Sequence, residues 1–139
     1  MPKRYYNYSG SVTSIGNSAF YGCSSLQNIT IPESVTSIEN NAFYGCSSLQ
    51  NITIPESVTS IENNAFSNCS SLQNINIPSN VTSIGNSAFS NCSSINKAII
   101  SSSADIKSSA YEFKNYTEFD FSKCKSIPVL ESTSNIGDV

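Results

Sequence analysis

The sequence contains no histidine among its 139 residues. Histidine is the usual general base of enzymes and a frequent metal ligand, so the chain lacks the residue most often found at both kinds of site. Two carboxylate pairs remain, Glu33 with Glu56 and Glu39 with Glu62, each separated by 23 residues. Like charges in copied surface positions are more often solvated neighbours than a catalytic pair, and the second pair offers too few ligands for Ca²⁺. We therefore expect no enzymatic activity, no cofactor and no metal site.

Charge is also scarce, because only 12% of the residues are charged and the net charge is −3. The absence of a basic patch argues against a nucleic-acid partner. No apolar run reaches the length of a membrane-spanning helix, so membrane insertion is not expected. Lys3 and Arg4 precede residues 5–12, which lack the apolar core of a secretion signal. We expect no signal peptide in this chain.

The sequence does contain a 23-residue unit that is written four times in succession. Each copy carries the pattern V-T-S-I-x-N-x-A-F-x-x-C-S-S, and the copies begin at Val12, Val35, Val58 and Val81. A fixed period in the range of about 20–50 residues indicates a solenoid in which each repeat contacts only its neighbours. We expect a single domain over 1–139, with a capping strand at 1–11, four repeats at 12–103, an irregular fifth repeat at 104–121 and a tail at 122–139.

Eight apolar positions recur at the same phase of every repeat. In the second copy they are Val35, Ile38, Ala42, Phe43, Cys46, Leu49, Ile52 and Ile54. Neither a helix nor a hairpin alone has this period. We therefore expect these side chains to form the inner wall of one coil, stacked on the same wall of the next.

Proline marks the end of one predicted strand in each coil. Residues 26–31 follow the pattern Leu-x-x-Ile-x-Ile, whose second half alternates as a short strand does, and Pro32 follows directly. Residues 35–38 predict a second short extended segment on the opposite side of the coil. Residues 19–23, preceded by Asn17, predict a single helical turn with an asparagine cap. The later copies have asparagine in the place of this cap, namely Asn40, Asn63 and Asn86.

Both ends of the array depart from the repeat. Tyr6 and Tyr8 lie one period before the two isoleucines of the first strand, which predicts an aromatic strand over the open end of the core. Residues 116–121 match the strand pattern again after a shortened coil, with 101–114 as an irregular return loop. The tail stops without a capping pattern, which favours the hypothesis that the chain is a fragment of a longer one.

Four cysteines recur at one phase of the repeat, namely Cys23, Cys46, Cys69 and Cys92. A line of parallel side chains cannot surround a metal ion tetrahedrally, and such side chains rarely meet the geometry of a disulfide. We interpret these cysteines as reduced thiols that act as small hydrophobes in the core. Cys124 falls outside this phase and is a candidate for greater exposure.

Residues 12–103, and more loosely 5–130, resemble the BspA-like surface-antigen branch of the leucine-rich repeats. The resemblance is carried by the repeated motif Leu26-x-x-Ile29-x-Ile31-Pro32-x-x-Val35-x-x-Ile38 followed by Ala42-Phe43-x-x-Cys46. Ser34, Ser57 and Asn80 stand where the general leucine-rich-repeat pattern has an inward asparagine. The Val/Ile pair of this branch is expected to replace that asparagine.

The resemblance implies a leucine-rich-repeat solenoid that is right-handed and curved, of the α/β horseshoe class. Most of its strands would be short and parallel, joined by short helical turns. Members are commonly cell-surface proteins implicated in adhesion to host proteins or other cells, which implies a cell-surface or extracellular location. Because no signal peptide is recognised in the chain, a cytoplasmic or virion-associated location stays open.

The exposed strand positions line up as rows of amides and hydroxyls on the expected concave face. The candidate partner-binding residues are Gln27, Asn28, Thr30, Gln50, Asn51, Thr53, Gln73, Asn74, Asn76 and Lys97. One hypothesis is an adhesion module whose polar groove binds a protein or glycan. The other is a structural spacer or presentation scaffold of a longer surface or virion-associated protein, in which the rows only solubilise the sheet and hydrogen-bond along it. Tyr21 and Tyr44 are expected to form a separate exposed aromatic pair.

Overall fold

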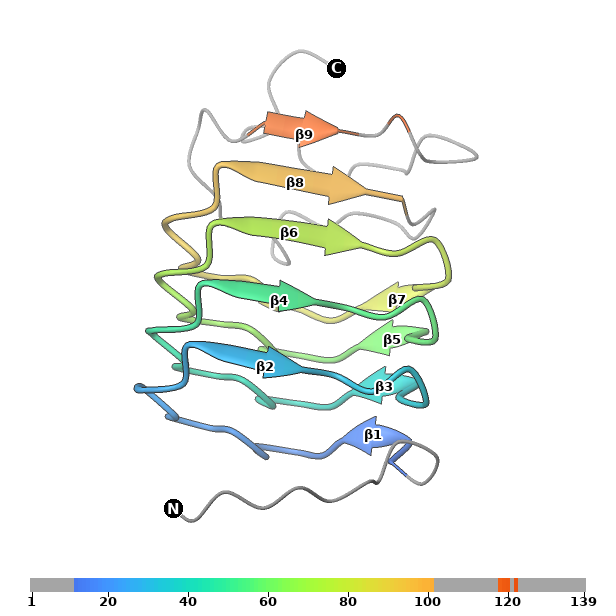
Figure 1. Cartoon of the computed structure of the whole chain (residues 1–139), viewed down its shortest axis with the longest axis horizontal. Helices are drawn as coiled ribbons and strands as arrows, with labels where there is room; N and C mark the ends of the chain where they lie inside the picture. The colour runs from blue at the N-terminus through green and yellow to red at the C-terminus, as the bar shows by residue number, and fades with distance from the viewer. Residues whose placement is uncertain (1–11, 102–117, 121, 123–139) are drawn as a thin grey trace.

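The chain forms a stack of coils in the computed structural model, which describes residues 12–101, 118–120 and 122 (Figure 1). Residues 23 positions apart lie side by side in paired strands, such as Ile15 with Ile38. The solenoid predicted from the period is therefore confirmed. The strand predicted within 1–11 and nearly all of the predicted loop and tail lie outside the described residues.

One side of the stack is a parallel sheet of four two-residue strands. These are β1 (Ser14–Ile15), β3 (Ser37–Ile38), β5 (Ser60–Ile61) and β7 (Ser83–Ile84). In the first three of these strands the isoleucine is buried while the serine is exposed or half-buried. This alternation confirms the second extended segment predicted in each coil, because a half-buried strand turns every other side chain to the core.

The opposite side, in front in Figure 1, carries the longer strands. They are β2 (Asn28–Thr30), β4 (Asn51–Thr53), β6 (Asn74–Ile77), β8 (Lys97–Ile100) and β9 (Glu118–Asp120). Strand β2 pairs with β4, and β6 pairs with β8, which pairs with β9, all in parallel. The pairing is interrupted between β4 and β6, although the Gln73 N–H donates to the Gln50 carbonyl at 3.2 Å. Phe119 lies opposite Ala98, as the pattern in 116–121 predicts.

The repeated apolar side chains fill the space between the two sides. All eight predicted positions of the second and third coils are buried. At the centre Phe20, Phe43, Phe66 and Phe89 stack in one column, with neighbouring ring centroids 5.1–5.2 Å apart. The predicted ladder is thus confirmed, and stacking of equivalent residues supplies the core that a single coil lacks.

Residues 19–23 form consecutive turns instead of the predicted helical turn, and the described part of the chain contains no helix. Residues 19, 21 and 23 donate backbone hydrogen bonds three residues back, whereas residues 18, 20 and 22 donate to carbonyls of the next coil. A helix would keep both sets within one coil, so the turns gain bonds between coils that a helix would forgo. Among the described residues, none lies in a helix long and apolar enough to span a membrane.

The sequence suits these turns at two positions of each coil where φ is positive. The first is occupied by Ser18, Asn41, Asn64 and Ser87, and the second by Gly22, Gly45, Asn68 and Asn91. A type II turn needs a positive φ at its third residue, where glycine and asparagine are the favoured residues. The glycine or asparagine directly before each cysteine of the repeat is therefore a turn signal.

The predicted cap asparagines bond across coils and do not cap helices. The Asn40 side-chain oxygen accepts the backbone N–H of Asn63 at 3.1 Å, and Asn63 does the same for Asn86 at 2.8 Å. This asparagine ladder satisfies backbone donors that the turns leave free. The prediction of a cap was wrong because it assumed that the next donor lay in the same coil.

Serine and threonine hydroxyls form further ladders between coils. Ser34 donates to the Val12 carbonyl at 2.5 Å and Ser57 to the Val35 carbonyl at 2.6 Å, while the Asn80 amide donates to the Glu56 carbonyl at 2.7 Å. These residues hold the place of the inward asparagine of other leucine-rich repeats. They tie adjacent coils together by hydrogen bonds. The sequence predicts that the Val/Ile pair alone replaces the inward asparagine, whereas in the structure these polar side chains also contribute to the contact between coils.

Candidate functional site

The outward residues of the front strands form two rows that cross the coils. Strand register and the repeat period place Asn28, Asn51, Asn74, Lys97 and Glu118 in the first row. They place Thr30, Thr53, Asn76, Ile99 and Asp120 in the second row. The rows are neutral over the first three coils and change character at β8 and β9.

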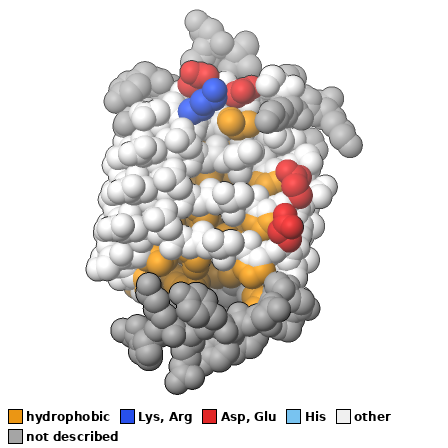
Figure 2. Space-filling model, viewed as in Figure 1, with side chains coloured by type: hydrophobic (Ala, Val, Ile, Leu, Met, Phe, Trp, Pro, Cys, Tyr) orange, Lys and Arg blue, Asp and Glu red, His pale blue; other side chains and the backbone are white. Residues whose placement is uncertain are grey.

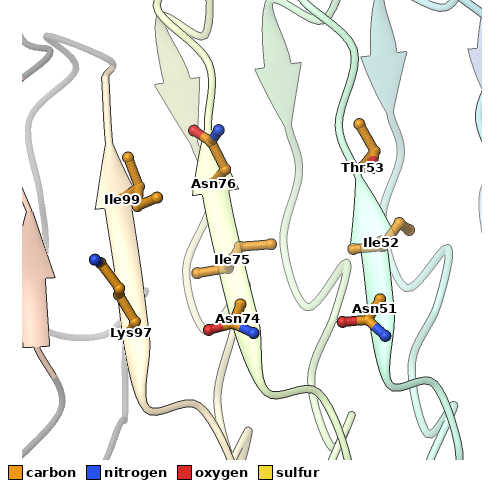
Figure 3. A pocket seen from close by; sticks show the side chains of 8 residues that line it. All are labelled: Asn51, Ile52, Thr53, Asn74, Ile75, Asn76, Lys97 and Ile99. Carbon is orange, nitrogen blue, oxygen red and sulfur yellow. The ribbon is translucent and has the colours of Figure 1, made fainter.

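A groove of about 230 Å³ lies on this face across β4, β6 and β8. It is lined by Asn51, Ile52, Thr53, Asn74, Ile75, Asn76, Lys97 and Ile99. In Figure 3 the isoleucines Ile52 and Ile75 lie between the two rows. The groove therefore has two margins that are polar except at Ile99, with a narrow apolar strip between them in which Ile52 is 9% and Ile75 only 2% exposed.

The structure brings together half of the predicted binding residues. Asn51, Thr53, Asn74, Asn76 and Lys97 line the groove. Among the others, Thr30 lines a second hollow of about 350 Å³ between the first two coils, which also contains Ile29, Ile31, Glu33, Thr53 and Pro55. The glutamines and Asn28 are exposed but line neither hollow.

Sequence reasoning missed Ile52 and Ile75, because it assigned both to the core. They are largely buried, at 9% and 2% exposed, and they reach the groove only as its floor. It also missed Glu118, although the strand match in 116–121 already placed this residue beside Lys97. That register was the available signal.

The polar side chains of the groove differ from those that tie the coils together. In the described part of the chain, the side chains of Asn51, Thr53, Asn74 and Asn76 form no hydrogen bond with another residue. All four residues are exposed. The hypothesis that these rows hydrogen-bond along the sheet therefore does not hold at these positions, and their donors and acceptors remain accessible to a ligand.

The charges near the groove are mostly negative. Lys97 is the single cation among the described residues, and its Nζ lies 3.5 Å from the Glu118 carboxylate. Their side chains are 43% and 68% exposed, so the pair contributes little to stability. Figure 2 shows acidic side chains at the margins of this face, with hydrophobic surface between the polar side chains. The Glu118 carboxylate partly neutralises the Lys97 ammonium group, which is the charge that an anionic ligand would need.

The comparison of sequences decides the family. The family model described as BspA type leucine rich repeat region matches residues 4–117 of the chain, in six copies. The chain belongs to this family. The resemblance drawn from the repeated motif is thereby confirmed, while no curated protein matches the chain.

Solved structures share the fold of this BspA-type chain. It is 23% identical to a leucine-rich repeat protein of T. pallidum, TpLRR, with a TM-score of 0.63 over 86% of this chain and 67% of that one. It is 20% identical to the pneumococcal vaccine antigen PcpA, with a TM-score of 0.67 over 90% of this chain and 30% of that one. A leucine rich cell surface protein of Faecalibacterium prausnitzii is 30% identical, with a TM-score of 0.54 over 86% and 36% of the two chains. The chain thus spans about a third of the latter two proteins.

Three cysteines of the BspA-type coils, Cys46, Cys69 and Cys92, are buried, whereas Cys23 is half-buried. Cys46 donates from Sγ to the Phe20 carbonyl at 3.2 Å, and Cys69 and Cys92 repeat this contact one and two coils later. Burial raises the pKa of Cys46 to about 11 and that of Cys92 to about 12, and it raises the pKa of Cys69 as well. The four cysteines of the ladder are free thiols, as predicted. No cluster in the described residues has three or more His, Cys, Asp or Glu residues placed to hold a metal.

Tyr21 and Tyr44 form a second surface feature, beside the turns of the first two BspA-type coils. Their rings stack at 4.9 Å with planes within 5°. Tyr21 is 56% exposed, and Tyr44 is half-buried. The predicted aromatic pair is therefore present, but it lies away from the groove and lines neither hollow.

Proposed function

We propose that the chain is a non-catalytic interaction module that binds its partner through the face of β4, β6 and β8. The observation that carries the proposal is the set of exposed polar side chains at Asn51, Thr53, Asn74 and Asn76, which have no partner among the described residues. Elsewhere in the stack, amides and hydroxyls in equivalent ladders bond between coils, as Asn40 does with Asn63. Polar side chains that form no hydrogen bond with the described residues are suited to contacts with another molecule.

The proposed location is the cell surface, within a longer adhesive protein. The family membership and the 30% identity to a leucine rich cell surface protein of F. prausnitzii support this proposal. A solenoid offers an extended face along which contacts repeat, and this geometry suits attachment to a large partner. Catalysis is not part of the proposal, because the chain lacks histidine and burial raises the pKa of the thiols of Cys46, Cys69 and Cys92.

A second candidate function is that of a spacer which presents other parts of a longer polypeptide. The backbone and side-chain hydrogen bonds between successive coils favour it, since they make a continuous stiff column. The two functions differ in what the front face does. In a spacer, changing that face leaves the properties of the protein unaltered.

Beads that carry the chain provide the test. Their attachment to surfaces coated with extracellular matrix and to cultured epithelial cells is compared with attachment of the variant Asn51→Ala, Thr53→Ala, Asn74→Ala. The matched control is Thr13→Ala, Ser14→Ala, Ser83→Ala, which changes three exposed residues on the opposite side of the stack. Circular dichroism and the unfolding midpoint establish that each variant is folded.

An interaction module predicts attachment that the front-face variant lowers by about tenfold and the control variant retains. Attachment that is equal in both variants would assign binding to another surface. No attachment to any of these surfaces would favour the spacer.

A further inference from the structure

We infer that the groove over β4, β6 and β8 binds a neutral glycan, meaning a saccharide chain without carboxylate, sulfate or phosphate groups. This inference rests on the proposed function, because it names the ligand class for the same face. It follows from the hydrogen-bonding groups, the charges, the apolar strip and the periodicity of the groove.

The hydrogen-bonding groups of the groove match hydroxyls. The side chains of Asn51, Asn74 and Asn76 each present an amide donor and a carbonyl acceptor, and Thr53 presents a hydroxyl. A sugar hydroxyl both donates and accepts, so neighbouring hydroxyls can use both ends of one asparagine amide. These amides form no competing bond with the described residues, and ligand contacts therefore replace only contacts with water.

The charges exclude acidic ligands. Lys97, the groove's cation, already faces Glu118 at 3.5 Å. Asp120 follows Ile99 in the second row, and Glu33 lines the neighbouring hollow. A sialylated or sulfated chain would meet more carboxylates than ammonium groups, whereas a neutral chain meets no repulsion.

The apolar strip suits a sugar ring better than a protein surface. Ile99, which is half-buried, provides an aliphatic contact on which the C–H groups of a pyranose can lie, and the buried Ile52 and Ile75 form the floor beside it. The volume of about 230 Å³ is smaller than that of sites for drug-sized ligands, which begin at roughly 300 Å³. Protein interfaces centre on buried tyrosine, tryptophan or arginine anchors, and the residues that line this groove include none of them.

The periodicity favours a ligand made of similar units. Asn51 and Asn74 present the same group one coil apart, as do Asn28 and Asn51. Parallel strands recur at about 4.8 Å, so equivalent contacts return at a short regular spacing. A polysaccharide presents repeated groups in the same way, whereas one protein surface presents a different side chain at each position.

A glycan array tests the inference on the full chain. The array carries neutral oligosaccharides, the same structures with sialic acid or sulfate, and matrix proteins before and after enzymatic deglycosylation. The variants are Asn74→Ala, Asn76→Ala in the groove and Ser60→Ala, Ser83→Ala on the opposite sheet. All proteins are checked for an unchanged unfolding midpoint before use.

We expect binding to neutral glycans that the groove variant loses by about tenfold and the opposite-sheet variant keeps. Preference for the sialylated or sulfated structures would overturn the inference. Binding to deglycosylated proteins that the groove variant abolishes, without glycan binding, would also overturn it but leave the proposed function standing. Absence of binding in every arm would overturn both.

Discussion

The side-chain oxygen of Asn63 accepts the backbone N–H of Asn86 at 2.8 Å, across the boundary between two coils. Asn40 accepts the N–H of Asn63 in the same way. One residue type therefore joins three successive coils where the chain leaves the short strands and enters its turns. The same residue type on the front strands makes no such bond at Asn74 and Asn76 in the described structure. Position, and not residue type, separates the structural asparagines from the candidate binding asparagines.

Removal of the ladder amide is expected to weaken the stack. Asn63→Ala leaves the Asn86 N–H without its acceptor, so the free energy of unfolding should fall by about 1 kcal/mol. Urea unfolding followed by circular dichroism measures the change. Asn76→Ala is the matched control and should alter stability by less than about 0.5 kcal/mol, as an exposed substitution usually does. Equal losses in the two variants would contradict the ladder.

The phenylalanine column is expected to contribute most at its centre. Phe66 is buried and its ring stacks on Phe43 and on Phe89. Phe66→Ala should therefore lower the free energy of unfolding by about 3–5 kcal/mol. Phe20 is only partly buried, so Phe20→Ala should cost distinctly less. Calorimetric or urea unfolding of the two variants compares them, and a greater loss at Phe20 would refute the packing argument.

The thiols are expected to differ in reactivity along the ladder. Cys23 is half-buried, whereas Cys46, Cys69 and Cys92 are buried. In a Cys124→Ser background, a disulfide reagent at about pH 8 should modify Cys23 first, because thiolate formation requires access to water. The other three should react only after denaturant is added. Rapid modification of all four in the native protein would show that the ladder is open.

Alkaline pH is expected to destabilise the fold through the same thiols. An unfolded thiol ionises at its ordinary pKa of 9.0, while burial raises the pKa of Cys46 to about 11. Because the unfolded chain releases protons first, the contribution is fully present below pH 9.0 and is lost as the pH rises through about 11. Urea midpoints across this range measure the loss. Cys46→Ala should reduce the slope, and an unchanged slope would exclude this thiol as a source.

A side chain at Gly85 is expected to destabilise the stack. A Cβ added there would lie 2.4 Å from the Asn63 nitrogen and 2.5 Å from its Oδ1, so it would displace the asparagine ladder. Gly85→Ala should cost about 1–3 kcal/mol, in the range of overpacked sites. Gly16, its equivalent in the first coil, has no atom within 4 Å of an added Cβ. Gly16→Ala is therefore the control, and thermal unfolding that ranks the two variants in the opposite order would refute the clash.

Most of the fold could be predicted, because the repeat places equivalent side chains in equivalent surroundings. Phe43 and Phe66 share one phase, so a stacked core was the simplest arrangement that buries both. Pro32 marked the end of a strand because it lacks the N–H that a ladder needs. The helical turn was wrong because Asn17 and Ala19 suit a helix start as well as a turn. Local propensity does not include the hydrogen bonds offered by the next coil.

The candidate site could be predicted only in outline. Alternation placed Asn51, Thr53, Asn74 and Asn76 on the outer face, and the register in 116–121 placed Glu118 beside Lys97. The contribution of Ile52 and Ile75 to the floor of the groove could not be predicted, since the repeat marks both positions only as core. Small differences between nearly identical coils, such as the interrupted pairing of β4 and β6, leave no mark in the repeat.

The amino-acid sequence by itself determined the stack, its inner wall and the two sides that carry strands. A strict period does this because only stacking of equal coils buries the same apolar positions in every copy. The tertiary structure alone decided which polar side chains bond between coils and which remain open to a partner. That choice depends on the rise between coils and on the direction of each backbone N–H and C=O group. Two asparagines of identical chemistry therefore behave differently: Asn63 accepts a backbone N–H of the next coil, whereas the Asn74 side chain forms no hydrogen bond with the described residues.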